Sequence, residues 1–278
     1  VLIRDDHSTD STPLILRNWA EDWSRIELLP QGDASVGVVT SYQALLGHVA
    51  RDDSHEDGLL AFRDQDDEWL PEKLERAARW HQENDADDIP ALYCSRAVLA
   101  DATLEPIGFS PLWKRPPSLR NALVENIALG CTVVMNRAAM RLLYRAWPDA
   151  VIAHDWWAYL VVCASGGIVY YDPEPSLRYR QHGRNTIGMA GNRLRQAGKR
   201  FRRFRKGQMP ALFTQATALK AAYGEVMAAQ SQQELARFLA LRSDDGGGLS
   251  AFTSAAFYRQ RWLDDLLLRG LIAAGRIS

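Results

Sequence analysis

Short apolar runs alternate with longer amphipathic stretches over the first two-thirds of the chain, and this alternation constrains the fold most. Strand-like runs lie at residues 1–4, 25–29, 58–63, 91–99, 131–136, 168–171 and 177–180. Helix-like stretches lie at residues 12–23, 35–51, 71–84 and 118–125, then in a stretch ending at Arg145, and at 155–165. Strands that alternate with helices predict an α/β fold, in which a mostly parallel sheet is flanked by helices.

Composition excludes several classes of protein. The 278 residues hold 33 Lys and Arg against 34 Asp and Glu, a balance that argues against a dedicated nucleic-acid binder. Cys94, Cys131 and Cys163 are far apart, so neither a disulfide framework nor a zinc site is indicated. Uncharged stretches fall short of the roughly 18 residues that a membrane span needs. We therefore expect a cytoplasmic protein.

The character of the chain changes near residue 190. Residues 193–206 hold eight Lys or Arg among fourteen positions and no acid, and Ala- and Leu-rich helical spacing follows from Met209. We therefore expect an α/β domain over residues 1–190 and a basic linker with a helical extension over 191–278. The basic segment is either a solvated linker or a contact with anionic lipid headgroups or a lipid-diphosphate acceptor at the inner face of the cell membrane, and binding of nucleic acid is a weaker third alternative.

Acidic side chains follow two of the predicted strands directly. Asp5 and Asp6 come after the first strand, and Asp64, Asp66 and Asp67 come after the strand at 58–63. Open α/β sheets bind their ligands at strand ends, and crowded carboxylates repel one another unless a cation lies among them. The second turn therefore favours Mg²⁺ or Mn²⁺, although a solvated turn that caps the next helix is an alternative.

Five segments in this order resemble one enzyme family. They are the turn at residues 5–10, the acidic loop with its continuation at 64–74, and the segments 130–136, 154–157 and 179–185. Over residues 1–190 they resemble glycosyltransferase family 2, in the branch described as rhamnosyltransferase-like. The resemblance implies the nucleotide-sugar-binding fold called GT-A. Members of the family begin with a further strand and helix, so we expect the catalytic domain to be N-terminally incomplete.

The resemblance also implies roles at the donor site. Asp6, with Asp5 as the weaker candidate, would contact the base or ribose of a nucleoside diphosphate. Asp64, Asp66 and Asp67 are similar to the family's metal-binding motif, in which one or two carboxylates would hold a divalent cation between the two phosphates while a neighbour would contact the ribose. Which of the three binds the cation stays open; Asp66 is the first candidate, with Asp67 as a second ligand and Asp64 at the ribose. His182 would be the third metal ligand.

Asp155 resembles the general base of the family, and on spacing alone it could instead cap a helix. His154 would orient Asp155 or pack beneath it. Trp156 and Trp157, together with Trp69, would stack on a sugar, although packing in the core is the alternative.

These inferences predict a metal-dependent inverting glycosyltransferase. The branch implies transfer of rhamnose from a dTDP- or UDP-linked donor to a bacterial surface glycan, free or lipid-linked. The alternative is a non-catalytic nucleotide-sugar-binding scaffold. A nucleotidyltransferase is disfavoured because the chain has no Gly-rich phosphate loop followed by Lys.

Overall fold

The computed structural model describes residues 1–51, 58–84, 88–181, 209–241 and 257–273, and it divides into two compact units, Val1–Asp57 and Gly58–Ser278. The first unit contains β1 (Leu2–Ile3), α1 (Thr12–Asp22), β2 (Glu27–Leu28) and α2 (Gly37–Ala50). The second contains β3 (Leu60–Ala61), β4 (Glu68–Trp69), α3 (Lys73–Asn84), β5 (Ala91–Ala100), β6 (Pro106–Phe109), α4 (Leu119–Ala122), the 3₁₀ turn η2 (Gly130–Thr132), β7 (Val134–Met135), α5 (Arg137–Arg145), α6 (His154–Ala164), β8 (Ile168–Arg180), α8 (Met209–Tyr223), α9 (Ala229–Ala240) and α11 (Trp262–Ala273).

The first unit is one β-α-β connection followed by a helix. β1 and β2 pair in parallel, with Leu2 opposite Glu27, as the sequence predicted. α1 begins with Pro13 in its first turn, where the missing backbone N–H costs no hydrogen bond.

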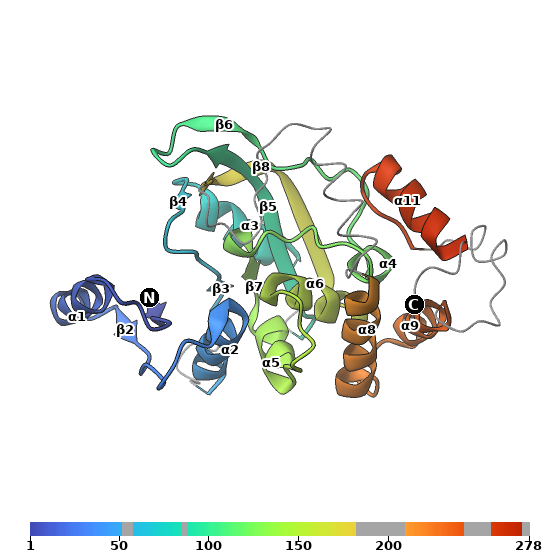
Figure 1. Ribbon diagram of the computed structural model, residues 1–278, viewed down its shortest axis with the longest axis horizontal. Helices are drawn as coiled ribbons and strands as arrows, with labels where there is room; N and C mark the ends of the chain where they lie inside the picture. The colour runs from blue at the N-terminus through green and yellow to red at the C-terminus, as the bar shows by residue number, and fades with distance from the viewer. Residues whose placement is uncertain (52–57, 85–87, 182–208, 242–256, 274–278) are drawn as a thin grey trace. The chain divides into compact units, whose positions relative to one another are not determined.

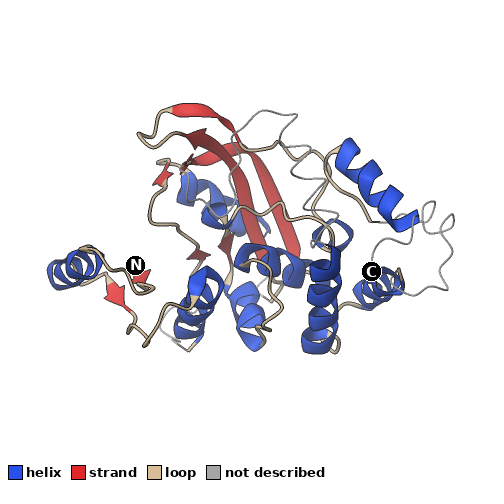
Figure 2. Ribbon diagram, in the orientation of Figure 1, coloured by secondary structure: helices blue, strands red, loops and turns tan. Residues whose placement is uncertain are grey.

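The second unit is built on a six-stranded sheet in the order β3-β7-β5-β8-β4, with β6 paired to β5. Its longest pairing, β5 with β8, is parallel, and the other four pairings are antiparallel. The α/β class is therefore confirmed, but this sheet is mixed and the expectation of a mostly parallel one is corrected. Figure 2 shows β5 and β8 running together through this unit with helices packed against them.

Three local predictions also differ from the structure. The segments 168–171 and 177–180 form one strand, β8, whose register against β5 shifts at irregularities around Arg96. Glu68 and Trp69, which the sequence analysis placed in the acidic loop and its continuation, form the strand β4. Cys131 and Thr132, predicted as the first residues of a strand, belong to the turn η2 instead.

Helix α6 is the centre of the core. Ten of its residues are buried, which is the pattern of a helix that is covered on all sides. From the C-terminal part, Tyr223 of α8 packs its ring edge-on against Trp157, with 5.9 Å between ring centres, and bonds the Ala146 carbonyl at 2.8 Å. Arg120 of α4 forms an ion pair with Glu234 of α9 at 2.9 Å. Helices α8 and α9 therefore pack against α6 and α4 within the second unit (Figure 1).

The domain boundary predicted near residue 190 falls between 182 and 208, outside the described residues. The basic segment 193–206 falls there too, so its proposed membrane contact stays a prediction. Within the described ranges, no helix is both long enough and apolar enough to span a bilayer.

Candidate active site

Four segments of the second unit meet at the acidic loop that follows β3. The Phe62 amide bonds the Val133 carbonyl at 3.0 Å, which ties the end of β3 to the strand β7 region. The backbone N–H of Arg180, at the end of β8, donates to Oδ1 of Asp67 at 3.0 Å. Gly130 of η2 in turn lies against the first turn of α6. The end of β8 therefore holds the loop directly, and β7 holds the strand that precedes it.

Asp67 is the buried carboxyl group of this loop, with 5% of its surface exposed. Its Oδ2 is covered and accepts no hydrogen bond of ordinary geometry within the described residues, although the Cys131 thiol lies beside it. Burial raises the pKa of Asp67 to about 6, and the charges of Asp64 and Asp66 act in the same direction. The ionised form of this carboxylate is therefore disfavoured unless a cation binds next to it.

The loop fits a divalent cation. One carboxylate oxygen of Asp64, one of Asp67 and the sulfur of Cys131 lie within 4.8 Å of one another. A buried, poorly satisfied carboxylate oxygen next to a second carboxylate is the donor set that such an ion requires. Asp67 was predicted as a ligand, whereas Asp64 was predicted to contact the ribose.

The other two predicted ligands have different outcomes. Asp66 is not a member of this cluster, and its backbone carbonyl accepts from Nε of Arg180 at 2.8 Å. His182 lies outside the described residues. Sequence reasoning missed Cys131, because no local signal in an apolar run shows which neighbour a thiol will contact.

Asp155 occupies the first turn of α6, where it is 7% exposed. The N-cap position belongs to Ala153, so the alternative of Asp155 as N-cap is wrong. Oδ1 of Asp155 accepts from the Trp156 amide at 2.7 Å. The Gly130 amide and the Asn126 side chain also donate to this carboxylate, but burial outweighs them and raises its pKa to about 6.

His154 is the first residue of α6 and precedes Asp155. Its ring is buried and packs edge-on against Phe62, with 5.3 Å between ring centres. Burial lowers the pKa of His154 to about 4, while the charge of Asp64 opposes this effect. The imidazole is therefore neutral at physiological pH.

Gly130 is required by this packing. A Cβ atom added at Gly130 would lie 2.7 Å from Nε2 of His154 and 3.3 Å from Oδ2 of Asp155. The side chains of Asp155 and His154 can therefore approach the η2 backbone this closely only because Gly130 has no side chain.

A buried lysine lies at the start of α3. Lys73 is 1% exposed, and its Nζ makes no hydrogen bond within the described residues. The ammonium lies 4.8 Å from the centre of the Trp69 ring, and Arg63 faces the same ring at 5.0 Å. Burial lowers the pKa of Lys73 to about 8, although Cys131 and Asp67 favour its charged form. The Trp69 ring therefore faces cationic side chains in this structure.

The positions of the two tryptophans of α6 contradict the prediction that they stack on a sugar. Trp156 is 6% exposed and donates its indole N–H to the Ala122 carbonyl at 2.7 Å, and Trp157 is completely buried. A ring without an exposed face cannot stack on a sugar. The alternative of packing in the core therefore describes Trp157, and Trp156 also belongs to the core.

Asp5 and Asp6 belong to the first unit and are described there by themselves. Asp6 accepts from the amides of Val36 at 2.9 Å and Gly37 at 2.8 Å, at the start of α2. Burial opposes ionisation of Asp6, but these bonds and those from Arg4 and Ser35 hold its pKa well below the usual range. Asp5 accepts from the Ser8 amide at 3.1 Å. Asp6 therefore fixes the start of α2, a role that the sequence did not reveal.

Comparison with known proteins agrees with this geometry. The family model described as "Glycosyl transferase family 2" matches residues 1–142. A protein of Shigella flexneri named dTDP-rhamnosyl transferase RfbG is 25% identical over 201 residues, which are 68% of this chain and 64% of that protein. A protein of Mycobacterium bovis named Uncharacterized protein Mb1547 is 28% identical over 184 residues, 66% of this chain and 50% of that protein. The chain thus spans between half and two-thirds of the length of these relatives.

Among solved structures, residues 1–349 of Staphylococcus aureus TarS resemble this chain with a TM-score of 0.52 and 14% identity, over the whole of this chain and 70% of that one. At this identity the likeness concerns the fold alone, and it confirms the expected GT-A fold. The matched family model covers half of the sequence, so the chain belongs to glycosyltransferase family 2.

Proposed function

We propose that this chain transfers a sugar from a nucleoside-diphosphate donor to an acceptor hydroxyl, with inversion at C1 and with Asp155 as general base. The observation that carries the proposal is the buried carboxylate of Asp155, whose pKa is raised to about 6 beside the acidic loop. A base works best when its pKa lies near the working pH, because it is then ionised and still basic enough to accept a proton.

The reaction needs one carboxylate. The acceptor oxygen attacks C1 from the face opposite the diphosphate, and its proton passes to Asp155. The bond between C1 and the phosphate oxygen breaks, and its electron pair leaves with the diphosphate. Hydrogen bonds from Gly130 and Asn126 support this assignment, because they hold the carboxylate in one orientation.

Asp64 and Asp67 would hold Mg²⁺ or Mn²⁺, with Asp66 and His182 remaining as predicted ligands. A bound cation supplies stabilisation of the negative charge on the diphosphate. The neutral His154 is buried next to Asp155 at the start of α6.

Likeness to a relative supports one choice of donor. The relative from Shigella is named a dTDP-rhamnosyl transferase, which supports dTDP-rhamnose as the first donor to test. The acceptor that we propose is a growing bacterial surface glycan, free or lipid-linked. Contact with the membrane through residues 193–206 would bring the chain to a lipid-linked acceptor.

The test is donor binding followed by turnover. Calorimetry with dTDP and UDP, each with and without Mn²⁺, measures the donor site, and release of dTDP from dTDP-rhamnose measures turnover. Asp155→Asn should retain nucleotide binding and lose turnover, while Asp149→Asn, at an exposed position, should keep both. Full turnover in Asp155→Asn would refute the mechanism. Nucleotide binding without turnover in the unaltered protein would favour the scaffold alternative.

A further inference from the structure

Two hydrogen bonds to Asp155 come from one segment, residues 123–130, which follows α4 and reaches η2. The donors are the side chain of Asn126 and the backbone amide of Gly130. Asn126 is itself oriented, because its Oδ1 accepts from the Ala128 amide at 3.0 Å, which leaves Nδ2 to donate. The orientation of the Asp155 carboxylate therefore depends on where this segment lies.

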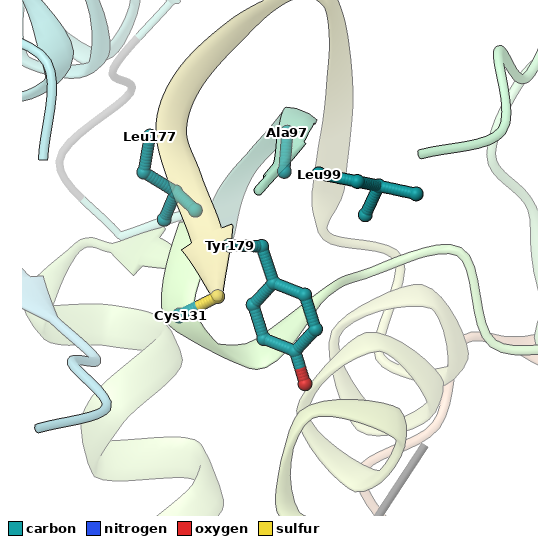
Figure 3. Packing of buried hydrophobic residues seen from close by; sticks show 5 residues of the cluster. All are labelled: Ala97, Leu99, Cys131, Leu177 and Tyr179. Atoms are coloured by element: carbon teal, nitrogen blue, oxygen red, sulfur yellow. The ribbon is translucent and has the colours of Figure 1, made fainter. Parts of the chain in front are cut away.

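The η2 end of segment 123–130 is fixed by the sheet. Cys131, the residue after Gly130, is completely buried. It packs with apolar side chains of β5 and β8, as Figure 3 shows, and these are Ala97, Leu99, Leu177 and Tyr179. The Thr132 hydroxyl accepts from the Ser95 amide of β5 at 3.1 Å. The Gly130 donor is therefore held by the core, whereas Asn126 lies four positions earlier and needs another support.

The α4 end of the same segment is held by residues 258–260, which lie shortly before α11. Each of these three consecutive residues bonds one residue of α4 or of segment 123–130, and the pairs are Tyr258 with Asn121 at 3.0 Å, Arg259 with Val124 at 2.7 and 3.0 Å, and Gln260 with Glu125 at 2.6 Å. The last of these contacts reaches the residue directly before Asn126.

The guanidinium group of Arg259 makes the central contact. Its Nε and Nη2 both donate to the carbonyl of Val124, a residue that is completely buried. Hydrogen bonds from a charged donor are roughly twice as strong as those between neutral groups. Burial raises the pKa of the neighbouring Glu125, and the Gln260 amide and the charge of Arg259 oppose this effect. Arg259 therefore supports both residues that precede Asn126.

We propose that Arg259 is a positioning residue for Asp155: it holds the Val124 carbonyl in place and thereby places the Asn126 side chain against the carboxylate. The inference rests on the proposed function, because it concerns the group that takes the proton of the acceptor. A base must lie within hydrogen-bond reach of that proton, and a displacement of about 1 Å can cost roughly 100-fold in rate. Arg259 acts through segment 123–130 and not on the substrate.

The first test is kinetic. In Arg259→Gln, kcat for release of dTDP from dTDP-rhamnose should fall at least about tenfold while the KM for the donor changes by less than about twofold, because the lost contact orients the base rather than binding the donor. Arg259→Lys keeps the charge and one donor, so its loss of kcat should be intermediate, and it takes the place of Arg259→Gln if that variant is unfolded. Arg237→Gln, at an exposed position on α9, should leave kcat and KM unchanged.

A double variant shows whether Arg259 acts through Asn126. Asn126→Ala should lose about as much kcat as Arg259→Gln, and adding Arg259→Gln to Asn126→Ala should slow turnover no further. Circular dichroism establishes that each variant is folded. Two losses that multiply in the folded double variant, or an unchanged kcat in folded Arg259→Gln, would overturn the inference.

A second readout needs no turnover. Asn126 donates to the ionised carboxylate, so its loss should raise the pKa of Asp155, which is measured from the ¹³C signal of its carboxyl carbon, assigned by its absence in Asp155→Asn. Arg259→Gln should raise this pKa as much as Asn126→Ala does, and should add nothing to Asn126→Ala.

Two outcomes of this titration contradict the positioning role. An unchanged pKa of Asp155 in folded Arg259→Gln would show that Asn126 keeps its place without Arg259. A rise that recurs in the Asn126→Ala background would show that Arg259 acts by its charge alone. Absence of turnover in the unaltered protein would refute the proposed function and leave the pKa comparison to decide this inference, so the two fail on different readouts.

Discussion

Replacing Asp155 with Asn should make the stability of the protein less dependent on pH, with a gain relative to the unaltered protein that grows toward neutral pH, while removing its activity. Burial raises the pKa of this carboxyl group from 3.8 to about 6 in the folded protein. A pKa difference of one is worth about 1.4 kcal/mol, so the ionised carboxylate costs the folded state about 3 kcal/mol. Asn carries no charge and avoids this cost.

The direction of the change in stability with pH follows from which state binds the proton of Asp155 more tightly. Between about pH 4 and pH 6 the folded protein holds the proton of Asp155 more tightly than the unfolded chain does. The stability of the unaltered protein therefore falls across this interval as the pH rises. The variant lacks this fall, so the difference in unfolding free energy between variant and unaltered protein should grow by about 3 kcal/mol from pH 4 to pH 8.

Urea unfolding of both proteins from pH 4 to pH 8 measures this difference. Hydrogen bonds that Asn fails to reproduce, such as those from Gly130 and Asn126, shift the two curves by an amount independent of pH, and they therefore cancel in the comparison. Asp149→Asn, at an exposed position, should show no pH-dependent gain. A gain in Asp155→Asn that is constant across the pH range would show that burial does not raise this pKa.

Three further outcomes test other parts of the site. Gly130→Ala should lower turnover at least tenfold, because the new Cβ would lie 2.7 Å from Nε2 of His154, whereas Gly32→Ala, which meets nothing within 4 Å, should leave turnover unchanged in the same assay. Asp67→Asn should abolish the Mn²⁺-dependent part of nucleotide binding in calorimetry, and unaltered Mn²⁺ dependence would exclude Asp67 as a ligand. Trp157→Ala should cost about 3–5 kcal/mol of unfolding free energy, as expected for a buried aromatic ring, and Trp262→Ala, 69% exposed, should cost little; a weaker donor affinity with unchanged stability in Trp157→Ala would restore its predicted role in stacking on a sugar.

Elements with strong local signals could be predicted from the sequence. Pro13 lies in the first turn of the helix Thr12–Asp22, and Pro71 precedes the helix Lys73–Asn84. The strand Ala91–Ala100 is apolar except at Ser95 and Arg96, which matches its largely buried position. β4 has no such signal. Its two residues form a strand because Glu68 pairs with Arg178 of β8, and this partner is not visible in a local window.

The sequence predicted the acidic residues of the candidate site but not the groups that surround them. The acidic loop and Asp155 could be predicted because the sequence shows directly which carboxylates follow a strand or begin a helix. The capping of α2 by Asp6 depends on Val36, 30 residues away, and the thiol beside Asp67 depends on where η2 lies after folding. Contacts between distant segments fix these features, so periodicity and spacing carry no information about them.

Burial gives these separate features one physical cause. It disfavours the charged form of each group that it covers, and so it raises the pKa values of Asp67 and Asp155 to about 6 and lowers that of His154 to about 4. At neutral pH the two carboxylates are consequently charged at a cost to stability, while the imidazole stays neutral. A cation at Asp67 or an acceptor proton at Asp155 would reduce that cost, because each neutralises one buried negative charge. The same desolvation that weakens the folded state therefore makes this loop and the start of α6 receptive to positive charge.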